Sequence, residues 1–311
     1  MNTFSLFQLS RFLFRKDDSS LVALSKVTLK NLLRPSRLAG FQSWNLPFLL
    51  LFAFQPLICP GKEVSSPPED VENLRKLAAG GDIRAQENLG FRYLHGKDLE
   101  QDYQEAHRWI GKAVQQDDPK AKIHMAVLYL NGYGVEADPT KAKELYQQSA
   151  RQGFPPGKTL LGNIYFHGIG TEVDYEEAAK WYRKAAESGY AQAKLHLGNL
   201  YFVGKGVPRN QEKAIDWIKK SAQAGDPEAQ YTIGLVYRFG NHLDQDYRKA
   251  AKWIRQSSEQ GYPTAMYLLG QMYYRGEGVD QDDEKAHYWI RRSAESDHEP
   301  AQEFLKNVIE K

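Results

Sequence analysis

Few residues of this chain have the types and spacing that could support catalysis or ligand binding. The segment GFPPGKT, residues 153–159, looks most like a phosphate-binding loop. It has three residues between its glycines where a P-loop has four, and no strand-like pattern precedes it. The glycine pairs Gly168/Gly170 and Gly204/Gly206 lack the third glycine of a dinucleotide-binding motif. These segments therefore indicate turns between helices.

The histidines and the single cysteine also form no recognisable set. The eight histidines are scattered, and none pairs with a carboxylate at the spacing of a zinc-protease helix. Cys59 is the only cysteine, so no intrachain disulfide is possible, and no G-x-S-x-G elbow is present. We therefore predict no catalytic residues, no metal, no cofactor and no enzymatic activity.

The charge of the chain is divided unevenly. Residues 1–62 hold eight Lys or Arg against Asp17 and Asp18, which leaves 33 basic and 37 acidic residues in the remainder. The slightly basic character thus belongs to the N-terminal segment, and it gives no reason to expect nucleic-acid binding.

Residues 1–61 have the composition of a leader. No charge occurs in 38–61, and the apolar stretch LPFLLLFAF at 46–54 has the length of a signal-peptide core but is short for a membrane span. This predicts export to the periplasm or out of the cell. Two alternatives are an uncleaved anchor, which would be the protein's only membrane contact, and mitochondrial import, which the Ser-, Leu- and Arg-rich upstream part suits. Residues 62–68 are expected to be a linker.

From there on, one pattern recurs every 36 residues. A small residue opens each repeat, at Ala85, Ala121, Gly157, Ala193, Ala229, Ala265 and Ala301. A fixed period of this length is typical of a solenoid. The pattern predicts a half-repeat helix at 69–84, six repeats at 85–120, 121–156, 157–192, 193–228, 229–264 and 265–300, and a capping helix at 301–311.

Each repeat is expected to hold two helices. In the first, a small residue, a Leu and a Tyr recur at a spacing of four, which places them on one helical face. A Gly follows the Leu in four repeats and Ile233 in another. Because glycine within a helix costs about 1 kcal/mol, it predicts a close crossing of another backbone. Gly-rich turns and Asp or Asn N-caps separate the helices. The fold class is therefore all-α, a right-handed superhelical solenoid of helix-turn-helix repeats. Asp98 and His242 replace the second turn glycine, which predicts differently shaped loops in repeats one and five.

The repeated pattern A-x-x-x-L-G-x-x-Y-x-x-G-x-G-V…D…A-x-x-W-[IY]-x-x-[AS]-A-x-x-G resembles the Sel-one-like repeat family, a relative of the tetratricopeptide repeats. The resemblance implies an adaptor that holds a protein or peptide on the concave side of the superhelix. Bacterial members are often exported to envelope or host-interaction roles, and eukaryotic members include scaffolds of membrane-associated degradation complexes. The paired cysteines of the secreted cysteine-rich branch are missing here.

In the related tetratricopeptide geometry the first helix of each repeat lines the concave wall. Carried onto this chain, that register implies that the third position of each repeat, including Ile123, Thr159 and Leu195, faces the partner. The amides among the candidates could bracket an extended peptide, and the tyrosines could anchor it, unless these aromatics only fill space between helices. Lys122, Lys158 and Lys194 are expected on a solvated face. The candidate partner-binding residues are Asn163, Asn199, Tyr231, Tyr267, Phe166, Phe202 and Gln271.

The sequence thus predicts a non-enzymatic interaction scaffold, exported and acting in the envelope or on a host. One alternative is an envelope enzyme acting on cell-wall glycan or a β-lactam, which would need clustered carboxylates or a Ser/Lys pair. A further alternative is a mitochondrial assembly factor. The oligomeric state is not predicted.

Overall fold

The computed structural model describes residues 71–240 and 243–309, and within them it contains helices but no strand. The leader (1–61), the linker (62–68) and His242 lie outside the described residues. Of the helices described, none is both long and apolar enough to cross a membrane.

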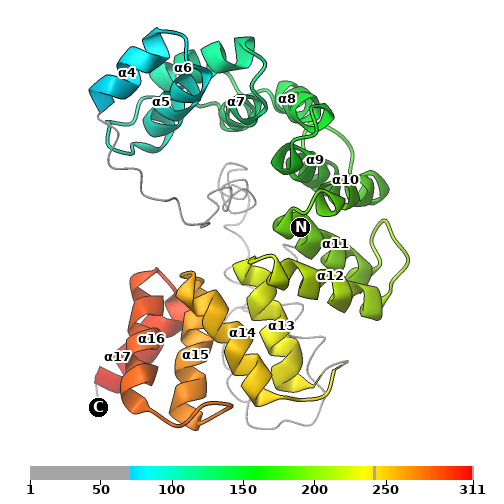
Figure 1. Cartoon of the computed structure of the whole chain (residues 1–311), viewed down its shortest axis with the longest axis vertical. Coiled ribbons are helices and arrows are strands. Elements are labelled where there is room, and N and C mark those ends of the chain that lie inside the picture. The colour runs from blue at the N-terminus through cyan, green and yellow to red at the C-terminus, as the bar shows by residue number, and fades with distance from the viewer. Residues whose placement is uncertain (1–70, 241–242, 310–311) are drawn as a thin grey trace, which may run out of the picture. The chain divides into compact units, whose positions relative to one another are not determined.

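Two kinds of helix alternate along the described chain, and each packs against the next in chain order, more extensively within a repeat than between repeats (Figure 1). The predicted all-helical fold of paired helices is confirmed. The first helices are α5 (Ile83–His95), α7 (Pro119–Asn131), α9 (Pro155–His167), α11 (Ala191–Val203), α13 (Pro227–Phe239), α15 (Pro263–Arg275) and α17 (Glu299–Ile309). The second helices are α4 (Val71–Ala79), α6 (Tyr103–Gln115), α8 (Pro139–Arg151), α10 (Tyr175–Glu187), α12 (Gln211–Gln223), α14 (Tyr247–Glu259) and α16 (Asp283–Glu295).

Most of the described helices begin at a side-chain cap, whereas α9, α11 and α15 follow Phe154, Tyr190 and Tyr262, which make no capping hydrogen bond. The predicted caps of the second helices are confirmed: Asp174, for example, accepts a hydrogen bond of 2.9 Å from the backbone N–H of Glu177. The first helices begin two residues before the small residue that opens each repeat. Asp118 caps α7 by accepting from the N–H of Ala121, and Pro119 occupies the first helical position. Proline fits there because its missing N–H would have no partner within the helix.

Left-handed residues end the helices. Each of α5, α7, α9, α11, α13 and α15 is followed by a glycine with φ between 65° and 75°. Asp98 adopts φ 59°, close to the 68° of Gly134 at the same position one repeat later. The prediction of a differently shaped loop in repeat one is therefore wrong, because aspartate is one of the few residues that tolerate this conformation.

The glycine within the first helix marks a close crossing of two helices, as predicted. A Cβ atom added to Gly198 would lie 2.8 Å from Cγ1 of Ile218 and 3.0 Å from the carbonyl oxygen of Ala214, both on α12. Added to Gly270, it would lie 2.9 Å from the carbonyl oxygen of Ala286 on α16. Hydrogen takes the place of a methyl group so that the second helix can approach.

The tyrosine three residues after this glycine joins successive repeats. The hydroxyl of Tyr201 on α11 accepts a hydrogen bond of 3.3 Å from Arg183 of the preceding repeat. The ammonium group of Lys213, from the second helix of the same repeat, lies 5.7 Å from the centre of the Tyr201 ring. Tyr273 has the same arrangement, with Arg255 donating at 2.9 Å. Each such ring therefore connects the second helices on either side of it.

Lys122 does not lie on a solvated face. It is buried at 3% exposure, pairs with Asp117, and donates a hydrogen bond of 3.1 Å to Gln152. Lys158, one repeat later, is half-buried and donates to the hydroxyl of Ser188 at 3.1 Å. The prediction of an exposed lysine series is therefore wrong at Lys122, because this position faces the end of the second helix of its own repeat.

These contacts predict opposite effects for two glycine-to-alanine changes. Gly270→Ala should lower the unfolding free energy by up to about 2 kcal/mol, because the overpacking cost of about 1–3 kcal/mol exceeds the gain of about 1 kcal/mol in helix propensity. Gly111→Ala in α6 should raise it by about 0.5–1 kcal/mol, because its Cβ would meet only Cε of Met125 at 3.6 Å. Urea denaturation followed by circular dichroism measures both. Equal effects of the two changes would contradict the close crossing.

Candidate functional site

We define the first-helix face as the third, seventh and tenth positions of each repeat, counting Ala85 as position one. The helix α5 contacts α7, and α7 contacts α9, so first helices of successive repeats also meet one another. The third position holds Glu87, Ile123, Thr159, Leu195, Tyr231 and Tyr267; the seventh holds Phe91, Val127, Asn163, Asn199, Leu235 and Gln271; the tenth holds Leu94, Leu130, Phe166, Phe202, Arg238 and Tyr274.

The third position is interior in the first four repeats. Ile123, Thr159 and Leu195 are buried. Leu195 belongs to one apolar cluster with Ala222 and Ile233, which come from α12 and α13. The expectation that these three side chains face a partner is therefore wrong, because all three are buried in the interior of the repeats. Only in the last two repeats is this position half-exposed.

Asn163 and Asn199 occupy the same repeat position in different surroundings. Asn163 is buried, and its Oδ1 accepts a hydrogen bond of 2.6 Å from the hydroxyl of Tyr182. Asn199 is half-buried, and its side chain has no hydrogen-bond partner among the residues that the structure describes. The difference arises on the second helix, where Ile218 takes the place of Tyr182 and supplies no hydroxyl. Asn199 therefore keeps its amide available, whereas Asn163 has a structural role.

Tyr231 and Tyr267 are half-buried and lie one repeat apart. The ring of Tyr231 lies 5.6 Å from that of Tyr262, and the ring of Tyr267 lies 5.3 Å from that of His298. Burial raises the pKa of both hydroxyl groups, 231 and 267. Each ring thus packs between helices on one side and remains partly accessible on the other. The tyrosines therefore fill space between helices and still offer a surface to a partner.

The remaining candidates lie in separate environments. The rings of Phe166 and Tyr175 meet edge to face at 5.2 Å, and Lys205 lies 5.4 Å from the centre of the Phe166 ring. Phe202 is half-buried. Gln271, also half-buried, hydrogen-bonds the hydroxyl of Tyr267 four residues earlier.

A buried ionic group in the first two repeats was not predicted. Glu87 is 6% exposed, and its carboxylate lies 2.9 Å from Nδ1 of His124 and 3.2 Å from Nζ of Lys120. Burial alone would raise the pKa of Glu87, but His124 and Lys120 together hold it below its usual value. The three residues come from adjacent repeats, so the group joins α5 to α7. The 36-residue period brings Glu87 and His124 to neighbouring first helices, but charged residues of these types are ordinarily exposed, so the sequence does not predict that Glu87 is buried.

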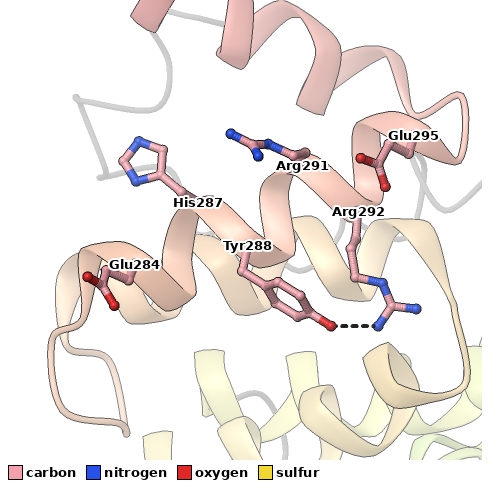
Figure 2. A pocket seen from close by; sticks show the side chains of 6 residues that line it. All are labelled: Glu284, His287, Tyr288, Arg291, Arg292 and Glu295. Atoms are coloured by element: carbon pink, nitrogen blue, oxygen red, sulfur yellow. Dashed lines mark hydrogen bonds between the residues drawn. The ribbon is translucent and has the colours of Figure 1, made fainter.

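A shallow pocket in the described part of the chain lies outside the first-helix face. Figure 2 shows its lining on α16, where the Tyr288 hydroxyl accepts a hydrogen bond of 3.2 Å from Arg292. All the lining residues belong to this single helix and all are exposed. The pocket is therefore a groove along one helix surface. In the described part of the chain, no three His, Cys, Asp or Glu side chains are grouped so that they could hold a metal ion.

Two carboxyl groups meet at the start of α13. Asp226 caps the helix by accepting a hydrogen bond of 2.8 Å from the N–H of Ala229. Glu228 in the first turn is partly buried, and burial, together with the charge of Asp226, raises its pKa to about 7. The rings of Tyr231 and Tyr262 lie close by. In sequence, Asp-Pro-Glu only indicates a capped helix start, so this group too was missed.

Glu228 predicts a pH dependence of stability. Its pKa in the folded state, about 7, lies above the ordinary 4.5, so the folded state holds the proton more tightly than the unfolded state. Stability should therefore fall as the pH rises from about 4.5 to 7 and then level off. Glu228→Gln should raise the unfolding free energy at pH 8 by on the order of 1–3 kcal/mol and flatten this slope. Urea denaturation between pH 5 and 8 measures it; the exposed Glu212→Gln is the control, and equal behaviour of the two variants would refute the assignment.

Comparison with known protein families identifies these repeats. The profile of the Sel1 repeat matches residues 83–118, 119–154, 155–190, 191–226, 227–262 and 263–298. These are the six predicted repeats, begun two residues earlier. No curated protein matched the chain.

Solved structures agree with this match. A protective antigen of uropathogenic Escherichia coli with an SLR fold is 33% identical with a TM-score of 0.61, over 78% of this chain and 52% of its own. This chain thus spans about half of that antigen. A Sel1 repeat protein from Oxalobacter formigenes is 29% identical with a TM-score of 0.53, over 77% of this chain and 80% of its own. An immunity protein from Pseudomonas aeruginosa, 23% identical over 70% of this chain and 83% of its own, shares the fold with a TM-score of 0.53. With its helix pairs, crossing glycines and period of 36 residues, the chain belongs to the Sel1 repeat family.

Proposed function

We propose that this protein is a non-enzymatic scaffold that binds a protein or peptide on the first-helix face of its later repeats. The observation that carries the proposal is Asn199. Its half-buried amide has no hydrogen-bond partner among the described residues, unlike the amide of Asn163 at the same repeat position, so its oxygen and nitrogen are open to a ligand. An amide side chain can donate to and accept from the backbone of an extended peptide, so a bound chain would supply what is missing.

The aromatic side chains give this face its second property. Tyr231 and Tyr267 are held in place by neighbouring rings and stay partly accessible, and Tyr274 is 53% exposed. Tyrosine is among the residues that contribute most to binding at protein interfaces, because it buries a large rigid surface at low cost in conformational entropy. Rings that are already held in place before binding lose still less conformational entropy when a partner binds.

The charges on this face are mostly paired. Arg238 lies 2.7 Å from the carboxylate of Glu277, and Arg275 lies 3.5 Å from the same group. Such a surface offers amide, aromatic and paired polar groups in place of a reactive side chain. It therefore suits recognition of a peptide better than catalysis.

We also propose that the chain acts in the periplasm or outside the cell. The uncharged segment at 38–61 supports this, and so does the similarity to a protective antigen of E. coli.

Asn199→Ala should weaken peptide binding by about tenfold, because two hydrogen bonds of about 0.5–1.5 kcal/mol each are lost, while the melting temperature stays unchanged. Peptides selected from a displayed random library against the full chain supply the ligands, and isothermal titration calorimetry measures their affinity.

The matched change is Asn163→Ala, one repeat earlier. It should lower stability by about 1–3 kcal/mol, because the hydroxyl of Tyr182 loses its buried acceptor. Tyr182→Phe in that background should restore part of the loss. The proposal fails if the selected peptides bind Asn199→Ala as tightly as the unchanged protein, or if their binding is abolished only by changes on the second helices.

A further inference from the structure

The helix α14 exposes cations that have no carboxylate partner. Arg248, Lys252 and Arg255 follow one another at spacings of four and three, so they form one stripe along the helix. All three are exposed, and no salt bridge joins any of them to another residue that the structure describes. The guanidinium of Arg255 donates to the hydroxyl of Tyr273, which positions the group without neutralising it.

Neighbouring second helices extend this stripe. Lys219 on α12 and Arg291 on α16 hold the same repeat position as Arg255, and both are exposed. Figure 2 shows the Arg291 side chain with no bond drawn to Glu295. We call Lys219, Arg248, Lys252, Arg255 and Arg291 the outer basic face.

Most other lysines of these helices are neutralised locally. Lys220 pairs with Asp216 at 2.7 Å, Lys249 with Asp246 at 3.1 Å, and Lys285 with Asp282 at 2.7 Å. The cations of the outer basic face differ from these three lysines in having no carboxylate partner in the described part of the chain. Lys213 and Arg292 also lack one there, but their charged groups lie against the rings of Tyr201 and Tyr288.

The charges of α14 also run against the helix dipole. The helix has no acidic residue in its first turn, which carries Arg248 and Lys249, and no basic residue in its last, which carries Glu259. The equivalent helix α16 has the opposite order, with Asp283 and Glu284 first and Arg292 last. Asp246 caps α14 and pairs with Lys249. Because acids stabilise the start of a helix and bases its end, Arg248 in the first turn and Glu259 in the last turn nevertheless oppose the helix dipole. Arg248 opposes the helix dipole, and its side chain has no ion-pair partner among the described residues that would offset this. A residue that does not serve the stability of its own helix is more readily explained by binding.

We propose that the outer basic face binds an acidic segment of a protein partner. Charge complementarity selects this occupant, and Tyr247, 41% exposed at the start of α14, adds an aromatic contact. The chain from residue 63 onward carries four more acidic than basic residues, so its net charge does not attract polyanions and any such attraction is local to this face. This face belongs to the second helices and is distinct from the first-helix face, so a chain using both would hold two partners at once.

The test uses the full chain and a fluorescein-labelled oligoglutamate peptide, with binding followed by anisotropy at low and at physiological salt. Arg248→Glu/Lys252→Glu should weaken binding by about tenfold or more. Its melting temperature should not fall, since glutamate at position 248 stabilises the start of α14. Loss of binding without loss of stability separates recognition from folding.

The matched control is Arg84→Glu/Lys306→Glu. It makes the same change in net charge, and Arg84 is exposed at the second position of α5 as Arg248 is in α14. Peptide affinity should change less than about twofold. Equal weakening by both double variants would overturn the proposal, as would absence of peptide binding by the unchanged protein. Binding to phosphatidylserine–phosphatidylcholine vesicles without binding to the peptide would overturn it in favour of a membrane surface.

Discussion

The close crossing of two helices in each repeat is the contact on which the rest of the structure depends. Where Gly198 leaves out a side chain, Ile218 of the second helix enters and is fully covered. Burying an isoleucine contributes about 1.5–3 kcal/mol, and glycine within a helix costs about 1 kcal/mol, so the exchange favours the crossing. Since each helix pair buries little by itself, the tyrosines that join one second helix to the next transmit this geometry along the stack.

The fold could be predicted from the sequence because its signals are local and repeated. The crossing glycines and the left-handed turn residues each act within one repeat. Because they recur in six repeats, each copy supports the same prediction. The predicted repeats open at the small residue, two residues after the first helices begin, although Asp118-Pro119 and Asp226-Pro227 carry the signature of a cap followed by a first-position proline. The aligned small residue marks a contact with the second helix of the preceding repeat, as Gly157 does with Ser149 on α8, whereas the cap marks where the first helix begins.

The site was only partly predictable, because equal positions in a repeat do not have equal surroundings. Asn163 and Asn199 are indistinguishable on their own helices, and only Tyr182 or Ile218 on the next helix decides which amide is occupied. Likewise, Lys122 is buried because Gln152 and Asp117 reach it from other elements. Exposure in a solenoid is decided by three adjacent helices, whereas a sequence pattern describes one.

The two sides of the repeat differ chemically for a reason that lies in folding itself. Aspartate is used at the turns, where it caps eight of the helices in the described part of the chain, from Asp82 to Asp282. Many acidic groups thereby lie at helix starts, whereas the first-helix face carries amide and aromatic groups and α14 carries a stripe of cations. Because capping and crossing already fix the backbone, side chains such as Asn199 and Arg248 are free from a structural role, and it is there that a partner can be recognised.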